Sequence, residues 1–228
     1  MTDIYEILRG EKDTDGNYQN QPVIVQGITG KYGSVHTKLM MEYGTNIAAG
    51  VTPGKGGQKF EDSVPIYNTV KEAIDVCGAQ IAIIFVPAKF FLSAAKEALD
   101  AGIKLLVAIP EHVPIRDTME VIELVKQKGA IMVGPNSPGV IIPGLIKVGI
   151  MPASPFSKGK IAVLSKSGTL LYEISNNLTS AGFGQNITIG IGGDPINGTR
   201  MIDAFNMVKD ESELDGICLL YTSDAADE

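Results

Sequence analysis

The stretch PVIVQGITGKYG, residues 22–33, decides the fold that we expect for this chain. Its first five residues contain the apolar run VIV, and they predict a buried β-strand. Glycines follow, and residues 34–43 carry the pattern of a helix. A strand, a glycine-rich loop and a helix in this order direct backbone N–H groups and a helix N-terminus toward a phosphate. Such glycines also occur in tight turns that bind nothing, so the loop alone does not decide between these two interpretations.

A second loop, VTPGKGG at residues 51–57, narrows the class of ligand. It follows a predicted strand at 46–50, where a nicotinamide dinucleotide site usually has an acidic residue for the ribose 2′-hydroxyl. This chain has neither Asp nor Glu there, and Lys55 lies between glycines. A lysine suits a phosphorylated ribose better than a bare diol, although it is also common in a solvated loop. We therefore expect coenzyme A, or a 2′-phosphorylated dinucleotide, rather than NAD.

Short apolar runs alternate with helical patterns along the whole chain, which predicts an α/β fold with a parallel sheet. After the first two strands, we expect strands at 64–67, 81–86, 105–109 and 131–133, and helices at 70–76, 88–100 and 115–128. The segment GPNSPG at 134–139 then interrupts the pattern, and Pro143 and Gly144 follow. Glycine and proline clusters mark loops and linkers. We therefore divide the chain into domains at 1–143 and 144–228.

The second domain has too few predicted elements to close a core by itself. Its pattern gives strands at 160–164, 187–191 and 214–220, and helices at 170–181 and 199–208. About three strands cannot bury both faces of a doubly wound sheet. We therefore expect an incomplete domain with exposed apolar faces at 187–191 and at Ile217.

Two further groups of residues follow predicted strands, where parallel α/β sheets place their ligands. Ile109, Pro110 and Glu111 form the first group; Glu111 either accepts a hydrogen bond from adenosine or simply favours the next helix by its charge. The second group is SKSGT at 165–169, with hydroxyls at Ser167 and Thr169. It predicts a second anion site at a helix N-terminus, or an ordinary serine cap. Tyr172 and the GGDP turn at 192–195 are candidate walls of the same pocket.

Composition excludes several classes of function. The formal charge is −7 with no long basic run, which argues against nucleic-acid binding. No apolar stretch is long enough to span a membrane, and the first residues lack a secretory pattern. Cys77 and Cys218 form no disulfide framework and indicate a reducing, cytoplasmic compartment. His36 and His112 lack partners at metal-ligand spacing, so we expect no metal site and interpret both as structural or peripheral.

Five motifs occur in an order that resembles one known family. They are GITG at 27–30, GVTPGKGG at 50–57, GPNSPG at 134–139, SKSGTLLYE at 165–173 and GIGGDP at 190–195. Over about residues 20–217 the chain resembles the alpha subunit of succinate–CoA ligase. The resemblance implies a Rossmann-like CoA-binding domain followed by a flavodoxin-like ligase domain. It also implies a beta subunit that holds ATP or GTP with Mg, and the formation of succinyl-CoA through a phosphohistidine and succinyl phosphate.

The resemblance also implies roles for individual residues. Thr29, Gly30, Lys31 and Tyr32 would line the CoA phosphates, and Lys55 would contact the ribose or its phosphate. Ile109, Pro110 and Glu111 would line the adenosine. Ser167, Gly168 and Thr169 would contact the active-site phosphate, and Tyr172 would approach the substrate. Three positions depart from the family pattern. Members often have Ser-Gln in place of Lys31-Tyr32, Thr in place of Pro110 and Cys in place of Ser137.

The family's phosphohistidine has no counterpart in these 228 residues, so no catalytic residue is assigned and we expect this chain alone to be inactive. One permitted back-translation of residues 218–228 resembles a transposase adapter used in sequencing libraries, so we expect these residues to be non-native. A mitochondrial matrix location would apply to a eukaryotic source. Two alternatives stay open: another NDP-forming ligase, acting on malate or acetate, and a stand-alone CoA-binding module. The second anion site argues against the module.

Overall fold

The computed structural model describes residues 3–10 and 12–221. Its first sheet has seven strands in the order β3-β4-β2-β1-β5-β6-β7. Their bounds are β1 Val23–Gln26, β2 Ile47–Val51, β3 Lys59–Phe60, β4 Val64–Tyr67, β5 Ile81–Ile84, β6 Leu105–Ala108 and β7 Ile131–Val133. All pairings are parallel except β3 with β4. The prediction of a parallel α/β sheet is therefore confirmed.

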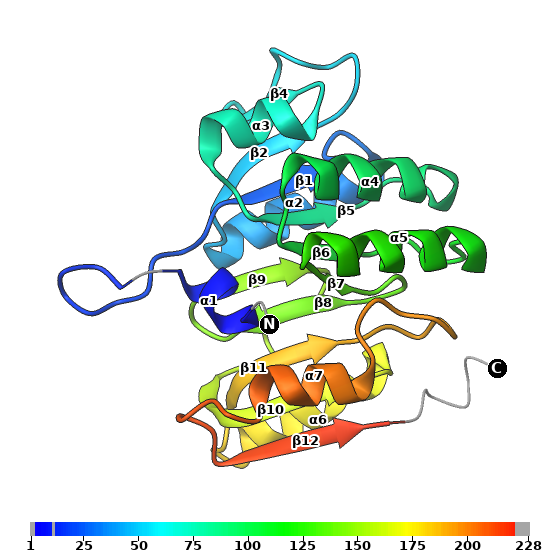
Figure 1. Cartoon of the computed structure of the whole chain (residues 1–228). Helices are drawn as coiled ribbons and strands as arrows, with labels where there is room; N and C mark the ends of the chain where they lie inside the picture. The colour runs from blue at the N-terminus through cyan, green and yellow to red at the C-terminus, as the bar shows by residue number, and fades with distance from the viewer. Residues whose placement is uncertain (1–2, 11, 222–228) are drawn as a thin grey trace.

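Helices cover both faces of this sheet, as Figure 1 shows. They are α2 Lys31–Tyr43, α3 Val70–Cys77, the 3-10 turn η1 Ala88–Phe90 with α4 Phe91–Ala101, and α5 Ile115–Lys128. One face packs against α3, α4 and α5 through a cluster that includes Val70, Phe91 and Val121. The central strands β1, β5 and β6 are buried at every position. This explains why they read as continuous apolar runs rather than alternating ones.

The second sheet has five strands, so the expectation of about three was wrong. Its order is β12-β10-β11-β8-β9. The strands are β8 Gly139–Ile142, β9 Ile146–Gly149, β10 Lys158–Ser165, β11 Gln185–Gly190 and β12 Gly216–Leu220, and the helices are α6 Gly168–Ser180 and α7 Met201–Val208. The hairpin β8–β9 pairs antiparallel with β11. Its glycines and prolines concealed it in the sequence, where we interpreted the segment as a linker.

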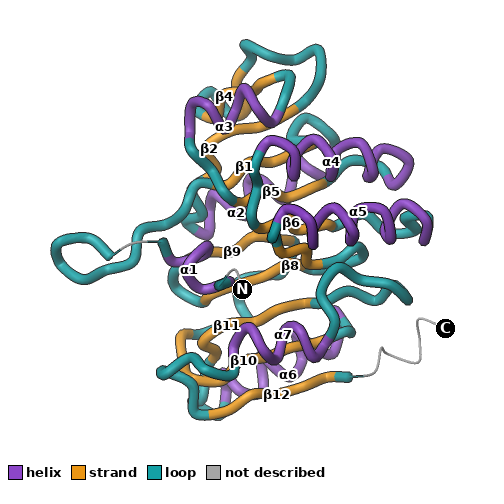
Figure 2. The backbone as a smooth tube through the Cα atoms, viewed as in Figure 1, coloured by secondary structure: helices purple, strands orange, loops and turns teal. Residues whose placement is uncertain are grey.

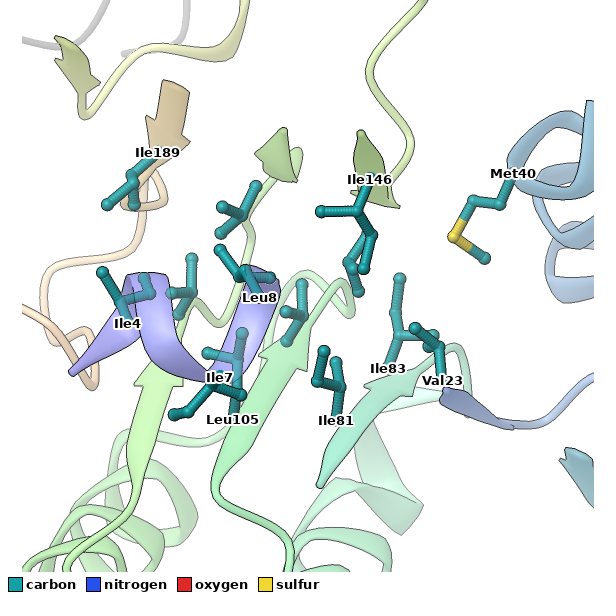
Figure 3. Packing of buried hydrophobic residues seen from close by; sticks show 14 of the residues in the cluster. Ile4, Ile7, Leu8, Val23, Met40, Ile81, Ile83, Leu105, Ile146 and Ile189 are labelled. Carbon is teal, nitrogen blue, oxygen red and sulfur yellow. The ribbon is translucent and has the colours of Figure 1, made fainter. Parts of the chain in front are cut away.

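The two sheets share one apolar core. A single cluster joins Ile81 and Leu105 of the first sheet, Ile146 of the hairpin and Ile189 of β11. The N-terminal helix α1, Ile4–Arg9, which the sequence did not reveal, lies between the sheets. Figure 3 shows Ile4, Ile7 and Leu8 among these side chains. Ile187, Ile189 and Ile191 are buried as a result, so the expectation of an exposed apolar face there was wrong; Ile217 is half-buried.

Polar contacts attach α1 to the second sheet. The Tyr5 hydroxyl donates to Asn186 Oδ1 at 2.7 Å. The Arg9 guanidinium donates to Glu211 Oε2 at 2.8 Å and lies 4.2 Å from the centre of the Tyr5 ring. Burial raises the pKa of Tyr5, so its hydroxyl stays a donor. An ion pair whose side chains are 9% and 13% exposed is costly to break from one side, because the other charge stays desolvated.

The division between the two domains at 143 and 144 stays a prediction. It falls within the β8–β9 hairpin, whereas the chain passes from the first sheet to the second between Val133 and Gly139. Figure 2 shows the strands of both sheets in orange and the loops that connect them in teal. Of the segment that we expected to be non-native, 218–220 continues β12, and 222–228 lies outside the described residues. Among the residues described, no helix is both long and apolar enough to cross a membrane.

Candidate functional site

A cleft of about 1000 Å³ opens where the carboxyl ends of strands from both sheets meet. The first sheet contributes the segments after β5 and β6, and the segment after β7 leads across to the second sheet. The second sheet contributes the segment after β10 and Gly193 after β11. The residues that line it are Tyr32, Phe85 to Ala88, Ile109 to His112, Asn136 to Pro138, Ile150, Lys166 to Thr169, Tyr172 and Gly193. Parallel α/β sheets bind their ligands at this edge.

Residues 136–138 of the predicted linker line the cleft, and hydrogen bonds of this segment join its two halves. The Asn136 N–H donates to the carbonyl of Pro110 at 2.9 Å. The Asn136 side chain donates to Asp194 Oδ1 at 3.0 Å, and Gly193 N–H donates back to the Asn136 carbonyl at 3.1 Å. Ser137 is buried, and its hydroxyl accepts from Gly139 N–H at 2.9 Å. The segment therefore holds the rim of the first sheet in a defined place against the second.

The two glycine loops lie side by side because β1 and β2 are neighbours. Gly27 N–H donates to the Val51 carbonyl at 2.9 Å. The Thr29 hydroxyl donates to the Thr52 hydroxyl at 3.2 Å. Helix α2 then starts very close to the loop, because a Cβ on Gly33 would lie 2.3 Å from the Gly27 carbonyl oxygen. A glycine is required at that contact, as phosphate-binding turns of this kind demand.

The loop that carries Lys55 is held by a residue that the sequence analysis missed. Asn68 Oδ1 accepts from Gly54 N–H at 2.8 Å and from Gly56 N–H at 3.1 Å. Lys55 itself is exposed, and its ammonium forms no ion pair with the described residues. An asparagine shortly after a strand carries no distinctive signal, so only the folded chain shows this role. The loop is fixed while its lysine stays free for a ligand.

At the start of α6, Ser167 acts as the helix cap. Its hydroxyl accepts from Leu170 N–H at 3.2 Å, and its own N–H donates to the Ser165 hydroxyl at 3.1 Å. The first N–H groups of a helix have no acceptor within the helix. Gly168 and Thr169 supply such groups at the cleft. The capping alternative therefore holds for the Ser167 side chain, and the backbone of the next two residues is left as the candidate anion donor.

Two tyrosines from different halves face the cleft. Tyr32 of α2 lies edge-on to His36 at 4.5 Å and to Phe85 at 5.9 Å between ring centres. Tyr172 of α6 lies edge-on to Phe156 at 6.5 Å. Burial raises the pKa of Tyr172 to about 12, and Tyr32 adds to the effect. Burial, then the charge of Glu111, also raises the pKa of Tyr32. Both hydroxyls therefore stay protonated at neutral pH.

The structure brings eight of the predicted site residues together in the cleft. They are Tyr32, Ile109, Pro110, Glu111, Ser167, Gly168, Thr169 and Tyr172. The other four are exposed outside the cleft lining: Thr29 and Gly30 on the loop after β1, Lys31 at the first position of α2, and Lys55 on the loop after β2. Phe85 to Ala88 and Lys166 also line the cleft, and we did not predict them, although both segments follow strand ends.

His112, which we interpreted from the sequence as structural or peripheral, lines the cleft. His36 lies behind the Tyr32 and Phe85 rings, where burial, then the charge of Lys147, lowers its pKa. Within the described ranges, no three His, Cys, Asp or Glu side chains gather as a metal site would require.

Solved structures share this architecture. The chain superposes on an ATP citrate lyase from Methanothrix soehngenii, solved with citrate and coenzyme A, with a TM-score of 0.79 over 88% of this chain and 36% of that one, at 22% identity. It superposes on a dinucleotide-forming acetyl-coenzyme A synthetase 1 from Ca. Korarchaeum cryptofilum with a TM-score of 0.72 over 96% of this chain and 45% of that one, at 17% identity. At these identities the likeness shows the fold alone.

Sequence comparisons give the family. The profile described as a CoA binding domain matches residues 18–112, and the profile described as CoA-ligase matches residues 164–222. A succinate–CoA ligase [ADP-forming] subunit alpha from Aquifex aeolicus is 51% identical over 87% of this chain and 65% of its own length. The subunit alpha from Methanothermobacter thermautotrophicus is 48% identical over 86% of this chain and 67% of its own length. Subunit alpha 2 from Archaeoglobus fulgidus is 46% identical over 90% of this chain and 71% of its own length. The chain thus spans about two thirds of the length of these relatives, and it belongs to the family of succinate–CoA ligase alpha subunits.

Proposed function

We propose that this chain binds coenzyme A and supplies part of the acyl-phosphate site of a succinate–CoA ligase. One observation carries the proposal: the cleft joins the rim after β6 to the N-terminus of α6. A ligase that transfers an acyl group to a thiol must bring a CoA site and an anion site together. A stand-alone CoA-binding module has no need of the second site.

The residue roles follow from the position of each group. Thr29, Gly30, Lys31 and Tyr32 surround the first turn of α2, whose cap makes no side-chain hydrogen bond, and its N–H groups suit the CoA phosphates. Lys55 adds a positive charge on the neighbouring loop for the ribose phosphate. Ile109, Pro110 and Glu111 form the wall for the adenosine. The Gly168 and Thr169 N–H groups bind the phosphate of the acyl phosphate, and the Tyr172 hydroxyl donates to the substrate.

The reaction itself is proposed from the family. A nucleoside triphosphate phosphorylates a histidine, the phosphoryl group passes to a succinate carboxylate, and the CoA sulfur attacks the resulting acyl phosphate. The C–S bond forms as the C–O bond to phosphate breaks, and phosphate leaves. The relatives are named as ADP-forming, which favours ATP, with Mg, on a beta subunit as partner. A cytoplasmic location stays a prediction.

Replacing Lys55 by alanine should weaken CoA binding by about 1–3 kcal/mol, the scale of a lost charge-assisted contact. Titration calorimetry at moderate salt measures this. Lys158→Ala is the matched control, because Lys158 is an exposed lysine at the first position of β10, away from its carboxyl end. Equal affinity in wild type and Lys55→Ala would remove Lys55 from the site. Tighter binding of NADP than of CoA would contradict the assignment of the ligand.

Incubation with γ-labelled ATP and a purified beta subunit should leave this 228-residue chain without acid-labile label. His36 lies in the aromatic wall of the first half, and His112 lies on the loop after β6. Neither histidine lies on the segment after β10 or on α6, which form the proposed anion site. Label on this chain would show that His36 or His112 accepts a phosphoryl group, and it would overturn the prediction that these 228 residues lack the phosphohistidine. Phosphoryl exchange that depends on succinate rather than malate or acetate, in a complete alpha–beta complex, tests the acid.

A further inference from the structure

We propose that His112 is a ligand-binding residue of the cleft, whose imidazole contacts a phosphate of bound CoA and makes binding tighter as the pH falls. The inference rests on the proposed CoA site and adds to it a residue outside the motif that defines the rim. Three observations carry it: the backbone conformation of His112, the lack of any structural use for its side chain, and the charges around it.

His112 adopts a left-handed backbone conformation with φ of 59°. L-residues rarely adopt this region, and a glycine would adopt it without steric cost. Among the described residues, four that are not glycine have a positive φ, and two of them, His112 and Asn136, line the cleft. The Asn136 side chain has a structural role, because it donates to Asp194. His112 likewise lines the cleft with a positive φ, but its imidazole makes no hydrogen bond of this kind.

The described residues give the His112 side chain no hydrogen bond, ion pair or ring contact. The side chain is exposed to the cleft, but its backbone is fixed on both sides. Pro110 is held by its bond from Asn136 N–H, and Val113 is buried at 6% exposure ahead of α5. The fold therefore presents a free imidazole from a fixed turn. Because the loop is already ordered, the imidazole can bind a ligand without the entropic cost of ordering that loop.

The charges around the cleft explain why a cation is needed at this point. Glu111 is the adjacent group on the same loop and repels phosphate, while Tyr32 on α2 and Tyr172 on α6 are neutral donors. Lys166, after β10, is the cation on the opposite wall. Asp194 lies beyond Gly193 and is bonded to Asn136. Among the described residues that line the cleft from the first sheet, His112 is therefore the one that can offer a positive charge to a phosphate.

The sign of the pH dependence follows from linkage. A phosphate attracts the imidazolium but not the neutral imidazole, so CoA binding should take up a proton at His112. The added affinity is present at acidic pH and is lost as the pH rises and the imidazole loses its proton. A charge-assisted contact should tighten binding by about tenfold at most, so wild type should bind CoA several-fold less tightly at pH 8 than at pH 6.

Titration calorimetry of the full chain with CoA between pH 5.5 and 8.5, in two buffers of different ionisation enthalpy, tests this proposal. Two variants preserve the turn: His112→Gly, which adopts the same φ freely, and His112→Asn, which tolerates it and keeps an uncharged donor. Both should bind with a nearly flat pH profile and take up less proton than wild type. Thermal unfolding of each variant confirms that the turn is retained. Variants that reproduce the wild-type profile and proton uptake would overturn the role of His112.

Two further arms separate the outcomes. Dephospho-CoA, which lacks the 3′-phosphate, identifies the contact: a lost pH slope assigns His112 to that phosphate, and a retained slope assigns it to the diphosphate. Wild type that binds CoA with no pH slope overturns the inference and leaves the proposed function standing. Wild type that binds no CoA at any pH overturns both. The two failures are thus distinguishable within one set of titrations.

Discussion

Replacing Gly33 by alanine should destabilise the protein by about 2–4 kcal/mol, at the upper end of single substitutions. The added Cβ would lie 2.3 Å from the Gly27 carbonyl oxygen and 3.2 Å from Phe85 Cβ. Backbone forms the first contact, so no side chain can rotate away, and α2 must move away from β1. The same movement displaces the loop that we propose for the CoA phosphates. Chemical denaturation and CoA titration measure the two effects.

Gly168→Ala is a matched control for this experiment. Gly168 also occupies the first turn of a helix that follows a strand and a short loop, but an added Cβ there would meet only Pro138 Cγ at 4.0 Å. Alanine is also a better helix former than glycine. We expect a change in stability within about 0.5 kcal/mol, or a slight gain. Equal losses of stability in the two variants would show that the close contact of Gly33 with the Gly27 carbonyl does not cause the destabilisation.

Replacing Leu8 by alanine should destabilise the protein by about 2–5 kcal/mol, the range for a buried leucine. Leu8 is fully buried in the core between the two sheets, among side chains that Figure 3 shows from both of them. The cavity would loosen the attachment of α1 and uncover β11. We therefore expect faster hydrogen exchange at the β11 amides together with the lower unfolding midpoint.

Val76→Ala serves as the comparison, because Val76 is 71% exposed on α3 and also loses methyl groups. Its effect should stay within about 0.5 kcal/mol. A Leu8→Ala variant as stable as Val76→Ala would show that α1 contributes little to the shared core. In that case the second sheet would be held by its own helices, α6 and α7.

Local sequence was sufficient where one element and the loop after it carry the signal. The apolar runs gave β1, β5 and β6, because a strand buried on both faces must be apolar at every position. The two glycine loops gave the edge that we propose for phosphate binding, because Gly27 and Gly33 meet within one strand–loop–helix unit. The rule that ligands bind at the carboxyl ends of parallel strands then placed residues 109–111 on that edge and residues 167–172 at a second anion site in the second domain. These inferences require no knowledge of which distant segments meet.

Tertiary structure decided what depends on distant partners. The hairpin β8–β9 is recognisable only by its pairing with β11, since its glycines and prolines are typical of a linker. Helix α1 is six residues long, and its stability comes from the core between the sheets rather than from its own sequence. His112 lines the cleft because Asn136, on another strand's loop, holds Pro110 in place. The sequence by itself therefore determined the sheet type, the family and the edge that we propose for phosphate binding. Only the folded chain decided which segments close the shared core and which side chains face one another across the cleft, because those contacts join residues far apart in the sequence.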